Sequence, residues 1–436
     1  MSEHFMGKFT GGDINYGTTV QACYNKVSYN TKPETPISIR ACMFFDGTLN
    51  NRTNVEQGKL GKRSGGSYDN ELSNIAILEG DYLKDKNVDI SFSLYVEGIG
   101  TTDLKSDSDI GAALGMRGTG IIAKVESGIV QLTEYIMKQN TNRKPIKEIS
   151  LDVFGFSRGA AAARNLVYAT LHDKGETLKS KLSSHGYKVG GVRVKFVGLY
   201  DTVAAYGVEH DNNTKQLHLD SLGGAEKVVQ LAAAEEHRLN FRLTNIDSAA
   251  NGLQIFLPGS HSDIGGGYVH NSKEENLRIL DSDNTKWLNA AQKVSLDKNK
   301  KWLLKSGWYL NDEIHDMTFS NELKVTRRGI SNRYSRIPLK LMARHAGENG
   351  VHFDLLNIAK DYPVPTELHQ VEFEIIESSP TTPDYWLSQS SQMLKDLRHG
   401  YLHFSACYDS FVGANEPQFT GNDPVNGLRR RVIQNG

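Results

Sequence analysis

Short apolar runs alternate with longer segments of helical spacing through most of the chain. Strand-like runs rich in β-branched and aromatic residues lie at 37–45, 88–96, 147–154, 190–199 and 253–257. Apolar residues at helical spacing occur at 71–82, about 121–137 and 158–171. Because strands that alternate with helices usually form a parallel sheet, the pattern predicts an α/β fold with a mainly parallel sheet and helices on both of its faces.

The pattern is less regular toward both ends of the chain. The first 36 residues are polar and rich in Gly, Asn and Thr, with a short strand expected near Val20–Cys23. Residues 276–365 are more charged, which predicts packed-on helices, and Gln370–Ile376 predicts one further strand. We therefore expect three parts: an N-terminal arm (1–36), an α/β core (37–275), and a helical insertion or cap with the C-terminal part of the same domain (276–436).

Composition indicates a globular protein without a dominant charge. Apolar residues make up 38% of the 436 positions, enough for a sizeable core, and 50 Lys and Arg nearly balance 51 Asp and Glu. A net charge of −1 gives no general attraction to nucleic acid or to an anionic membrane, and no nucleic-acid partner is expected. Three scattered cysteines and the lack of an HExxH motif predict neither a disulfide framework nor a metal site, and no cofactor is expected.

The N-terminal segment has neither a basic region nor an apolar stretch of the kind that a cleavable signal peptide requires. No uninterrupted apolar run reaches the roughly 18 residues of a membrane-spanning helix. We therefore expect synthesis in the cytoplasm, and any action outside the cell would need a dedicated export route.

The most informative segment is Leu151-Asp-Val-Phe-Gly-Phe-Ser-Arg-Gly159, in which Ser157 stands between two glycines. A strand precedes this G-x-S-x-G motif and an Ala-rich helix follows it, which is the context of a nucleophile elbow. Such a turn exposes a serine hydroxyl, and it leaves no room for side chains two positions to either side. Ser157 is therefore the candidate nucleophile, although an ordinary βα turn with a surface serine has the same sequence form.

A serine needs a histidine base and a carboxylate that orients it, and hydrolases of this fold carry them in the order serine, acid, histidine. Asp201 follows the strand at 190–199, and His261 follows the strand at 253–257. Both therefore fit the carboxyl edge of the predicted sheet, where Ser157 also lies. An Asp at a strand end can equally be a turn or helix-capping residue.

Other residues compete for these roles. Asp263 is an alternative acid, and His403 is an alternative base because hydrolase histidines often come late in the chain. His270 and His399 are weaker candidates. His237 is expected on a helix, where it would make ordinary hydrogen bonds.

An oxyanion hole needs two backbone N–H groups. One is expected from Arg158, directly after the candidate nucleophile, and the other from Gly47 or Thr48 in the loop after the first strand. The side chain of Arg158 is expected to contact a carboxylate such as Asp46 or a phosphate group. The glycines at 111–120 lack the lysine of a phosphate-binding loop and are interpreted as a loop that borders the serine.

Several of these segments together resemble the type VI secretion phospholipase effectors of the first lipase-effector family, which are α/β-hydrolases. The segments are FFDGTLNN, YVEGIGT, FGFSRGAAAAR, GLYDTV and SHSDIGGGY, in this order within residues 38–275. Two later segments, RIPLKLMARHAG and YLHFSA, are also similar to the family.

The resemblance implies that Ser157 is the nucleophile, Asp201 the acid and His261 the base of an enzyme that hydrolyses an ester of membrane glycerophospholipids. It also implies export by the type VI system on a spike protein of the valine-glycine repeat class, toxicity in the periplasm of a rival bacterium, and a cognate immunity protein. Two alternatives stay open: a soluble esterase or thioesterase with a small substrate, and a non-catalytic interaction protein on a hydrolase scaffold.

Overall fold

The computed structural model describes residues 34–108, 120–172, 177–204, 213–281, 290–317, 322–408 and 428–436. Residues 35–436 form one compact unit. The expected strand at Val20–Cys23 and most of the Gly-rich run at 111–120 lie outside the described residues.

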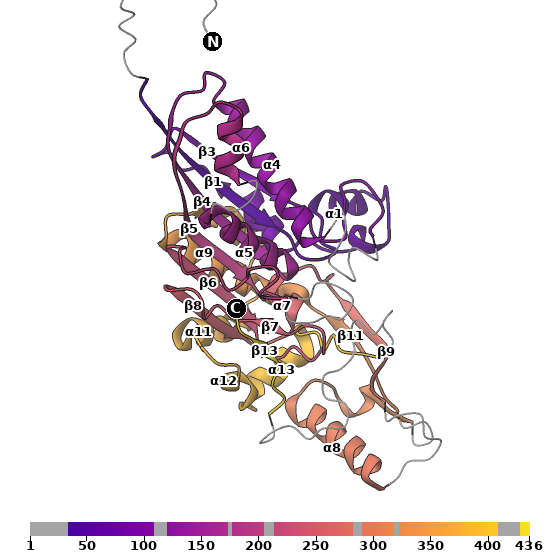
Figure 1. The fold of residues 1–436 in the computed structure, drawn as a ribbon. Coiled ribbons are helices and arrows are strands. Elements are labelled where there is room, and N and C mark those ends of the chain that lie inside the picture. Colours follow the sequence, from indigo (N-terminus) through magenta and orange to yellow (C-terminus); the bar gives the residue numbers. More distant parts are fainter. Residues whose placement is uncertain are drawn as a thin grey trace, which may run out of the picture. The chain divides into compact units, whose positions relative to one another are not determined.

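A six-stranded sheet forms the centre of this unit, and every neighbouring pair of its strands is parallel (Figure 1). The strand order is β3-β1-β4-β5-β6-β8. The strands are β1 (Ile37–Phe45), β3 (Ile90–Val96), β4 (Ile146–Phe156), β5 (Val189–Tyr200), β6 (Lys227–Ala233) and β8 (Gly252–Leu257). The predicted α/β fold with a parallel sheet is therefore confirmed.

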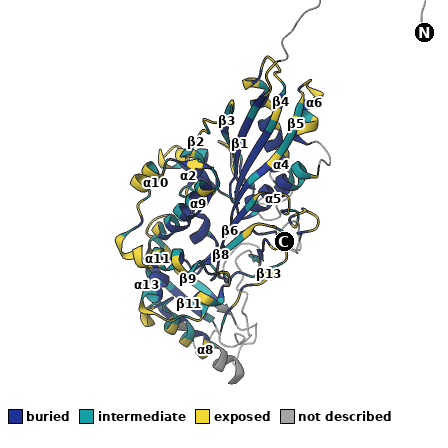
Figure 2. Ribbon diagram, turned by 90° about the vertical axis from the view of Figure 1, so that its left-hand side faces the viewer, coloured by how far each residue is buried: buried dark blue, intermediate teal, exposed yellow. Residues whose placement is uncertain are grey.

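Helices cover both faces of the sheet. One face packs against α4 (Ile121–Gln139), α5 (Arg158–Leu171) and α6 (Leu178–Ser184), and the other against α2 (Asn74–Gly80) and α9 (Arg336–Glu348). The strands alternate accordingly: in β1, Met43 and Phe45 enter one apolar cluster, whereas Cys42 and Phe44 enter the other. The strands are buried through most of their length (Figure 2) because both faces are covered.

The region after residue 271 differs from its prediction, because it contains a second sheet and not helices alone. Three antiparallel strands lie in the order β10-β11-β9, namely β9 (Ser272–Asp281), β10 (Ile314–Met317) and β11 (Glu322–Ile330). Buried and more exposed residues alternate along β11, but one inward position is Arg327, which pairs with the buried Glu274. A buried ion pair in place of two apolar residues explains why the hydrophobic pattern did not reveal these strands.

The predicted strand at Gln370–Ile376 is wrong, since this segment is helix α11 (His369–Ser378). Val371 and Ile375, four positions apart, are buried, whereas Phe373 between them is 64% exposed. This is helical spacing, and it overrides the strand propensity of the β-branched residues.

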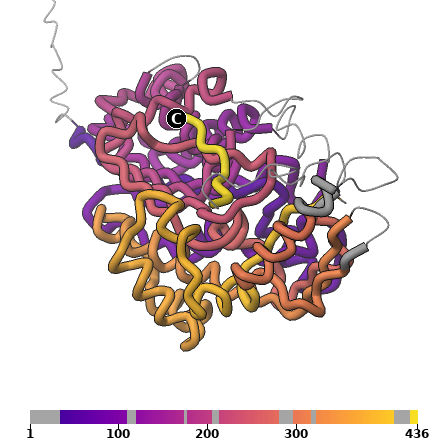
Figure 3. The backbone as a smooth tube through the Cα atoms, turned by 90° about the horizontal axis from the view of Figure 1, so that it is seen from below, coloured from indigo at the N-terminus to yellow at the C-terminus, as the bar shows by residue number. Residues whose placement is uncertain are grey.

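Two small sheets attach distant segments to the core. Strand β2 (Tyr82–Leu83) pairs with β12 (His352–Phe353), and β7 (Leu243–Thr244) pairs with β13 (Ile433–Gln434). Figure 3 shows the C-terminal segment, in yellow, lying along the part of the chain that contains β7.

The remaining elements are short helices and one longer helix. They are α1 (Arg52–Lys59), α7 (His261–Gly265), α8 (Ala290–Ser306), α10 (Leu355–Asp361), α12 (Asp384–Leu387), α13 (Gln392–Tyr401), η1 (Gly66–Tyr68), η3 (Asn311–Glu313), η4 (Asn332–Ser335) and η5 (Thr366–Leu368). Within the described ranges, no helix combines the length and apolarity that a membrane-spanning segment requires.

Candidate active site

Ser157 stands at the sharp turn between β4 and α5. Its backbone has φ 59° and ψ −128°, a conformation that costs energy for a residue other than glycine and that persists where the surrounding structure holds it. The Ser157 N–H donates to the Tyr200 carbonyl at 3.0 Å, which fixes the turn to the neighbouring strand. The residue has the geometry of the predicted elbow and is 4% exposed.

The two glycines of the motif are required by the packing around this turn. A Cβ on Gly155 would lie 2.6 Å from Ala160 Cα, and a Cβ on Gly159 would lie 2.2 Å from the Asp46 carbonyl oxygen. Neither neighbour is a flexible side chain that could move aside. The chain therefore turns tightly enough for α5 to begin directly after Ser157.

Asp201 lies next to this turn, at the carboxyl end of the adjacent strand. Phe156 and Tyr200 are register partners in β4 and β5, so the residues that follow them, Ser157 and Asp201, leave the sheet side by side. The Val203 N–H donates to the Ser157 carbonyl at 3.4 Å across this junction. Asp201 is fully buried and, like Ser157, has a positive φ, of 45°.

His261 begins α7, the short helix that follows β8. Its Nδ1 lies 2.6 Å from Asp201 Oδ2. Its ring also lies against Phe156, with the ring centroids 4.7 Å apart, and against Phe241 at 4.9 Å. The structure thus brings together Asp201, His261 and the residue before Ser157.

The Ser157 hydroxyl and the His261 imidazole are not joined by a hydrogen bond. Nε2 of His261 has no hydrogen-bond partner among the described residues, and neither has the Ser157 hydroxyl. Catalytic hydrogen bonds are often long in the unliganded state of an enzyme and tighten with substrate. Both groups are thus available to a third molecule.

Sequence reasoning missed Arg431, which lies in the C-terminal segment just before β13. Its Nη1 lies 2.5 Å from Asp201 Oδ1 and 3.1 Å from the Ala233 carbonyl oxygen. The ion pair is completely buried. Nothing in the sequence links two residues 230 positions apart, so no spacing signal could have revealed this contact.

The surroundings keep Asp201 ionised and His261 neutral at neutral pH. Burial on its own raises the pKa of Asp201, but the charge of Arg431 and the hydrogen bond from His261 outweigh it and lower that pKa below its usual range. Burial lowers the pKa of His261, although Asp201 works in the opposite direction. A neutral imidazole that donates Nδ1–H to a carboxylate leaves Nε2 as a proton acceptor.

A second buried carboxylate, Glu236, bonds to the backbone at the start of α7. We call this segment, residues 260–265, the histidine turn. Glu236 Oε2 accepts a hydrogen bond from the His261 N–H at 3.1 Å, and the Glu236 carboxylate pairs with Arg238. Burial raises the pKa of Glu236, but the charge of Arg238 outweighs that effect and lowers it to about 2. Glu236 is thus ionised and fixes the start of α7.

The predicted oxyanion region lies beside Ser157, with one correction. The Gly47 N–H donates to its neighbour Asp46 Oδ1 at 2.7 Å, so it is already engaged. The Thr48 N–H has no hydrogen-bond partner among the described residues, and Arg158 is the first residue of α5, where the N–H lacks an intrahelical acceptor. Thr48 and Arg158 are the better pair of donors.

The expected contact between the side chains of Arg158 and Asp46 is absent. Nε of Arg158 instead donates to the Thr48 hydroxyl at 2.8 Å, and burial lowers the pKa of Arg158 to about 10. Asp46 accepts from the Tyr95 hydroxyl at 2.5 Å. Burial raises the pKa of Asp46 to about 6, so its carboxylate is easily neutralised.

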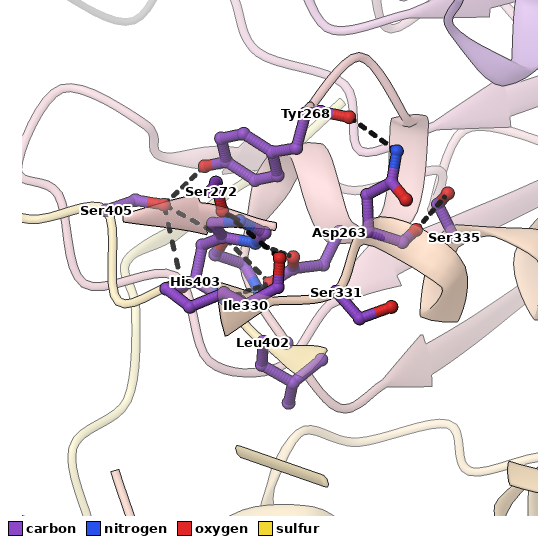
Figure 4. A network of polar contacts seen from close by, with 12 residues as sticks. Asp263, Tyr268, Ser272, Ile330, Ser331, Ser335, Leu402, His403 and Ser405 are labelled. Carbon is purple, nitrogen blue, oxygen red and sulfur yellow. Dashed lines mark hydrogen bonds and ion pairs between the residues drawn. The ribbon is translucent and has the colours of Figure 1, made fainter. Parts of the chain in front are cut away.

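The competing residues lie in other arrangements. Asp263 and His403 bond to each other at 2.8 Å (Figure 4), and Asp201, not Asp263, holds His261. His399 contacts Glu313. His237 lies in an irregular segment after β6, which corrects its predicted place on a helix. His270 is exposed, on the wall of a surface hollow.

In the part of the chain that the structure describes, no group of three or more His, Cys, Asp or Glu side chains is arranged to hold a metal ion. The expectation that no metal or cofactor takes part remains a prediction.

Comparison with known families and structures gives two informative matches. A sequence model of the family described as "T6SS, Phospholipase effector Tle1-like, catalytic domain" matches residues 170–296, a range that contains Asp201 and His261 but not Ser157. The fold is similar to that of the Tle1 effector bound to the VgrG spike from the Type 6 secretion system, with a TM-score of 0.64 and 22% sequence identity. The similarity covers 98% of this chain and 100% of that chain.

A crystal structure of an uncharacterized protein from Pseudomonas aeruginosa is a weaker match, with a TM-score of 0.45 and 19% identity over 80% of this chain and 52% of that chain. No protein with a curated description matches the sequence. The family match at residues 170–296 and the fold shared with the Tle1 effector confirm the predicted resemblance to the type VI secretion phospholipase effectors with a Tle1-like catalytic domain.

Proposed function

We propose that this protein is a serine-dependent phospholipase that cleaves a carboxylic ester of membrane glycerophospholipids through an acyl-enzyme. The observation that carries the proposal is the junction of β4 and β5, where a strained serine lies beside a buried aspartate that holds an imidazole. This is the arrangement that acyl transfer by a serine requires.

In the first step, Ser157 Oγ attacks the ester carbonyl carbon while its proton passes to His261 Nε2. The carbonyl oxygen becomes an oxyanion, which the N–H groups of Arg158 and Thr48 stabilise at the start of α5. The intermediate collapses to an acyl-serine, and His261 returns the proton to the departing lysophospholipid alcohol. Water then repeats the sequence and releases the fatty acid.

Asp201 and Arg431 prepare His261 for this cycle. The carboxylate fixes the tautomer with Nδ1 protonated and stabilises the imidazolium that forms on attack. The guanidinium of Arg431 keeps that carboxylate ionised and prevents it from rotating.

A surface hollow supports a substrate that carries a phosphate group. The hollow has a volume of about 170 Å³, and its lining includes Lys59, His270, Arg333 and Arg336. Glu71 also lines the hollow and pairs with Lys59, so the excess positive charge comes from Arg333 and Arg336. Burial and the nearby charge of Arg333 lower the pKa of Arg336. Such a cluster is suited to the phosphate of a lipid head group.

The hollow shares a wall with the histidine turn. Asn74, which lines it, donates to the Ile264 carbonyl of α7 at 2.8 Å and to the Ser335 carbonyl at 3.0 Å. A head group in this hollow would therefore contact residues that are fixed to α7, which supports a phospholipid over a neutral ester.

The test is release of fatty acid from phosphatidylglycerol and phosphatidylethanolamine vesicles, with labelling by a fluorophosphonate probe. We expect Ser157→Ala to abolish both, a loss of at least about 10³-fold. Turnover of short-chain esters alone would favour a small-substrate esterase or thioesterase. Absence of both labelling and acyl release would favour a non-catalytic interaction protein.

We further propose that the protein is carried by a valine-glycine repeat spike protein into the periplasm of a rival cell and is neutralised by an immunity protein. The similarity to an effector solved together with a VgrG spike supports this proposal. Co-purification with the spike protein encoded nearest to it tests it, and failure to associate would contradict it.

A further inference from the structure

A second carboxylate–imidazole pair lies next to the candidate active site. His403 Nδ1 lies 2.8 Å from Asp263 Oδ1, and both side chains are buried (Figure 4). Asp263 belongs to α7, the same five-residue helix that begins with His261. His403 comes from the segment after α13, 140 positions away.

Asp263 holds the start of α7 through its other oxygen. Oδ2 accepts hydrogen bonds from the Ser260 N–H at 2.9 Å, from the Ser260 hydroxyl at 3.0 Å and from the His403 N–H at 3.0 Å. Ser260 is the residue directly before His261. The carboxylate therefore joins the His403 segment to the backbone that carries the proposed base.

His403 also contacts the chain after α7. Its Nε2 lies 2.6 Å from the Ser272 hydroxyl, and its ring stacks on Tyr268 with the centroids 3.7 Å apart. The other groups around it are the Ser405 hydroxyl, which bonds to Tyr268 and Ser260, and Glu274, which accepts from the Phe404 N–H. One imidazole thus joins α7 to the segment that follows it.

The histidine turn depends on such contacts because its own sequence does not make it rigid. A helix of five residues is not stable by itself, and two glycines follow it directly. Gly266 and Gly267 have φ of 80° and 104°, so the chain there uses conformations that other residues rarely adopt. Tertiary bonds must therefore fix where the His261 ring points.

We infer that Asp263 and His403 are positioning residues for His261. They hold the first turn of α7 so that Nε2 of His261 faces the Ser157 hydroxyl. Neither residue touches the reacting atoms, and the inference rests on the proposed function of Ser157 and His261.

The test uses two substitutions of His403 that keep different halves of the imidazole. His403→Asn retains a donor at the position of Nδ1, which can still reach Asp263. His403→Gln places its amide near the position of Nε2 and gives up the bond to Asp263. We expect His403→Gln to lower kcat by about 10- to 100-fold, with KM changed less than about twofold, and His403→Asn to recover most of the loss.

A matched control separates positioning from stability. Leu182 is fully buried in α6, away from the histidine turn, so Leu182→Ala should lower the melting temperature without a comparable loss of kcat. Equal losses of kcat in Leu182→Ala and His403→Gln at equal melting temperature would overturn the inference. So would an unchanged kcat in His403→Gln.

Two further variants keep the inference testable if His403→Gln does not fold. Ser272→Ala removes the bond to Nε2 of His403, together with a long one (3.4 Å) to the Ile330 carbonyl, and should lower kcat by a few-fold; wild-type kcat in this variant would contradict the inference. Ser157→Ala, measured alongside, tests the proposed function separately. Full hydrolysis by Ser157→Ala would refute that function, whereas an inactive Ser157→Ala with a fully active His403→Gln would overturn the positioning role alone.

Discussion

Two buried aspartate–imidazole pairs each have one member on α7, His261 in the first and Asp263 in the second, and the pairs differ in what surrounds them. Asp201 and His261 are 2.6 Å apart, and Asp263 and His403 are 2.8 Å apart. In the first pair the second carboxylate oxygen faces a guanidinium, and Nε2 of the imidazole has no hydrogen-bond partner among the described residues. In the second, neutral donors surround the carboxylate, and Nε2 is bonded to a serine beneath a stacked tyrosine.

The difference shows that a carboxylate–histidine contact does not identify a base. A base needs a ring nitrogen that is free to accept a proton and a carboxylate that stays charged while the imidazolium forms. Only the first pair has a ring nitrogen without a hydrogen-bond partner among the described residues, whereas the second uses both of its ring nitrogens to join segments of the chain.

The strongest test of this difference is the same substitution, His to Asn, at both His261 and His403. Asn in place of His261 removes the proton acceptor, and we expect kcat/KM to fall by about 10³- to 10⁴-fold. His403→Asn should stay within a few-fold of wild type. Fatty-acid release from phosphatidylglycerol vesicles measures both, and equal losses in the two variants would remove the distinction between the pairs.

Arg431 provides a smaller test, because it contacts only the first pair. Arg431→Lys keeps the charge but cannot reproduce the contacts of the guanidinium with Asp201 and the Ala233 carbonyl, so we expect kcat to fall by about 10- to 100-fold. Arg430→Lys is the matched control, since Arg430 pairs with Asp384 at the surface. Loss of kcat in both variants would point to a general effect of the C-terminal segment.

If the surface hollow beside Arg333 and Arg336 binds the lipid head group, substitutions there should change substrate preference more than overall activity. Arg336→Ala should lower turnover of phosphatidylglycerol by about three- to tenfold, since it removes one partner of a charge-assisted hydrogen bond, and should leave short neutral esters unaffected. Arg193→Ala, at an exposed position on β5, is the control. A parallel loss for both substrates would contradict a head-group role for the hollow.

The smallest expected effect is on pH dependence. Burial lowers the pKa of His261 from its ordinary value of 6.5, so activity should be lost on acidification only below that pH, where the imidazole becomes protonated. Arg431→Gln removes the positive charge beside the Asp201 carboxylate, so that carboxylate stabilises the His261 imidazolium more strongly. The acid limb of kcat/KM should then move upward, by up to about one pH unit.

The local structure around Ser157 was predicted correctly, whereas the catalytic roles of the site residues stay predictions. The strand, the glycines and the helix around Ser157 lie within one short segment, and packing at Gly155 and Gly159 explains why the motif has this form. The order of the parallel strands then placed Asp201 near Ser157 at the same edge. The resemblance to the phospholipase effectors pointed to the same residues.

The contacts that hold the site could not be predicted, because they join residues far apart in the chain. Arg431 reaches Asp201 across 230 positions, and His403 reaches Asp263 across 140. The buried Arg327–Glu274 pair concealed the strands of the second sheet, since charged residues at inward positions resemble a solvated surface. In α11, β-branched residues indicated a strand where tertiary packing formed a helix.

The pairing of β13 with β7 bears on how the protein responds to proteolysis. All three residues of the proposed triad occur before residue 262, yet the guanidinium that neutralises Asp201 arrives with a strand near residue 431. A protease cut between these points would leave every reacting group intact, and the counter-charge of Asp201 would then be held to the core by non-covalent contacts alone, among them the pairing of β13 with β7.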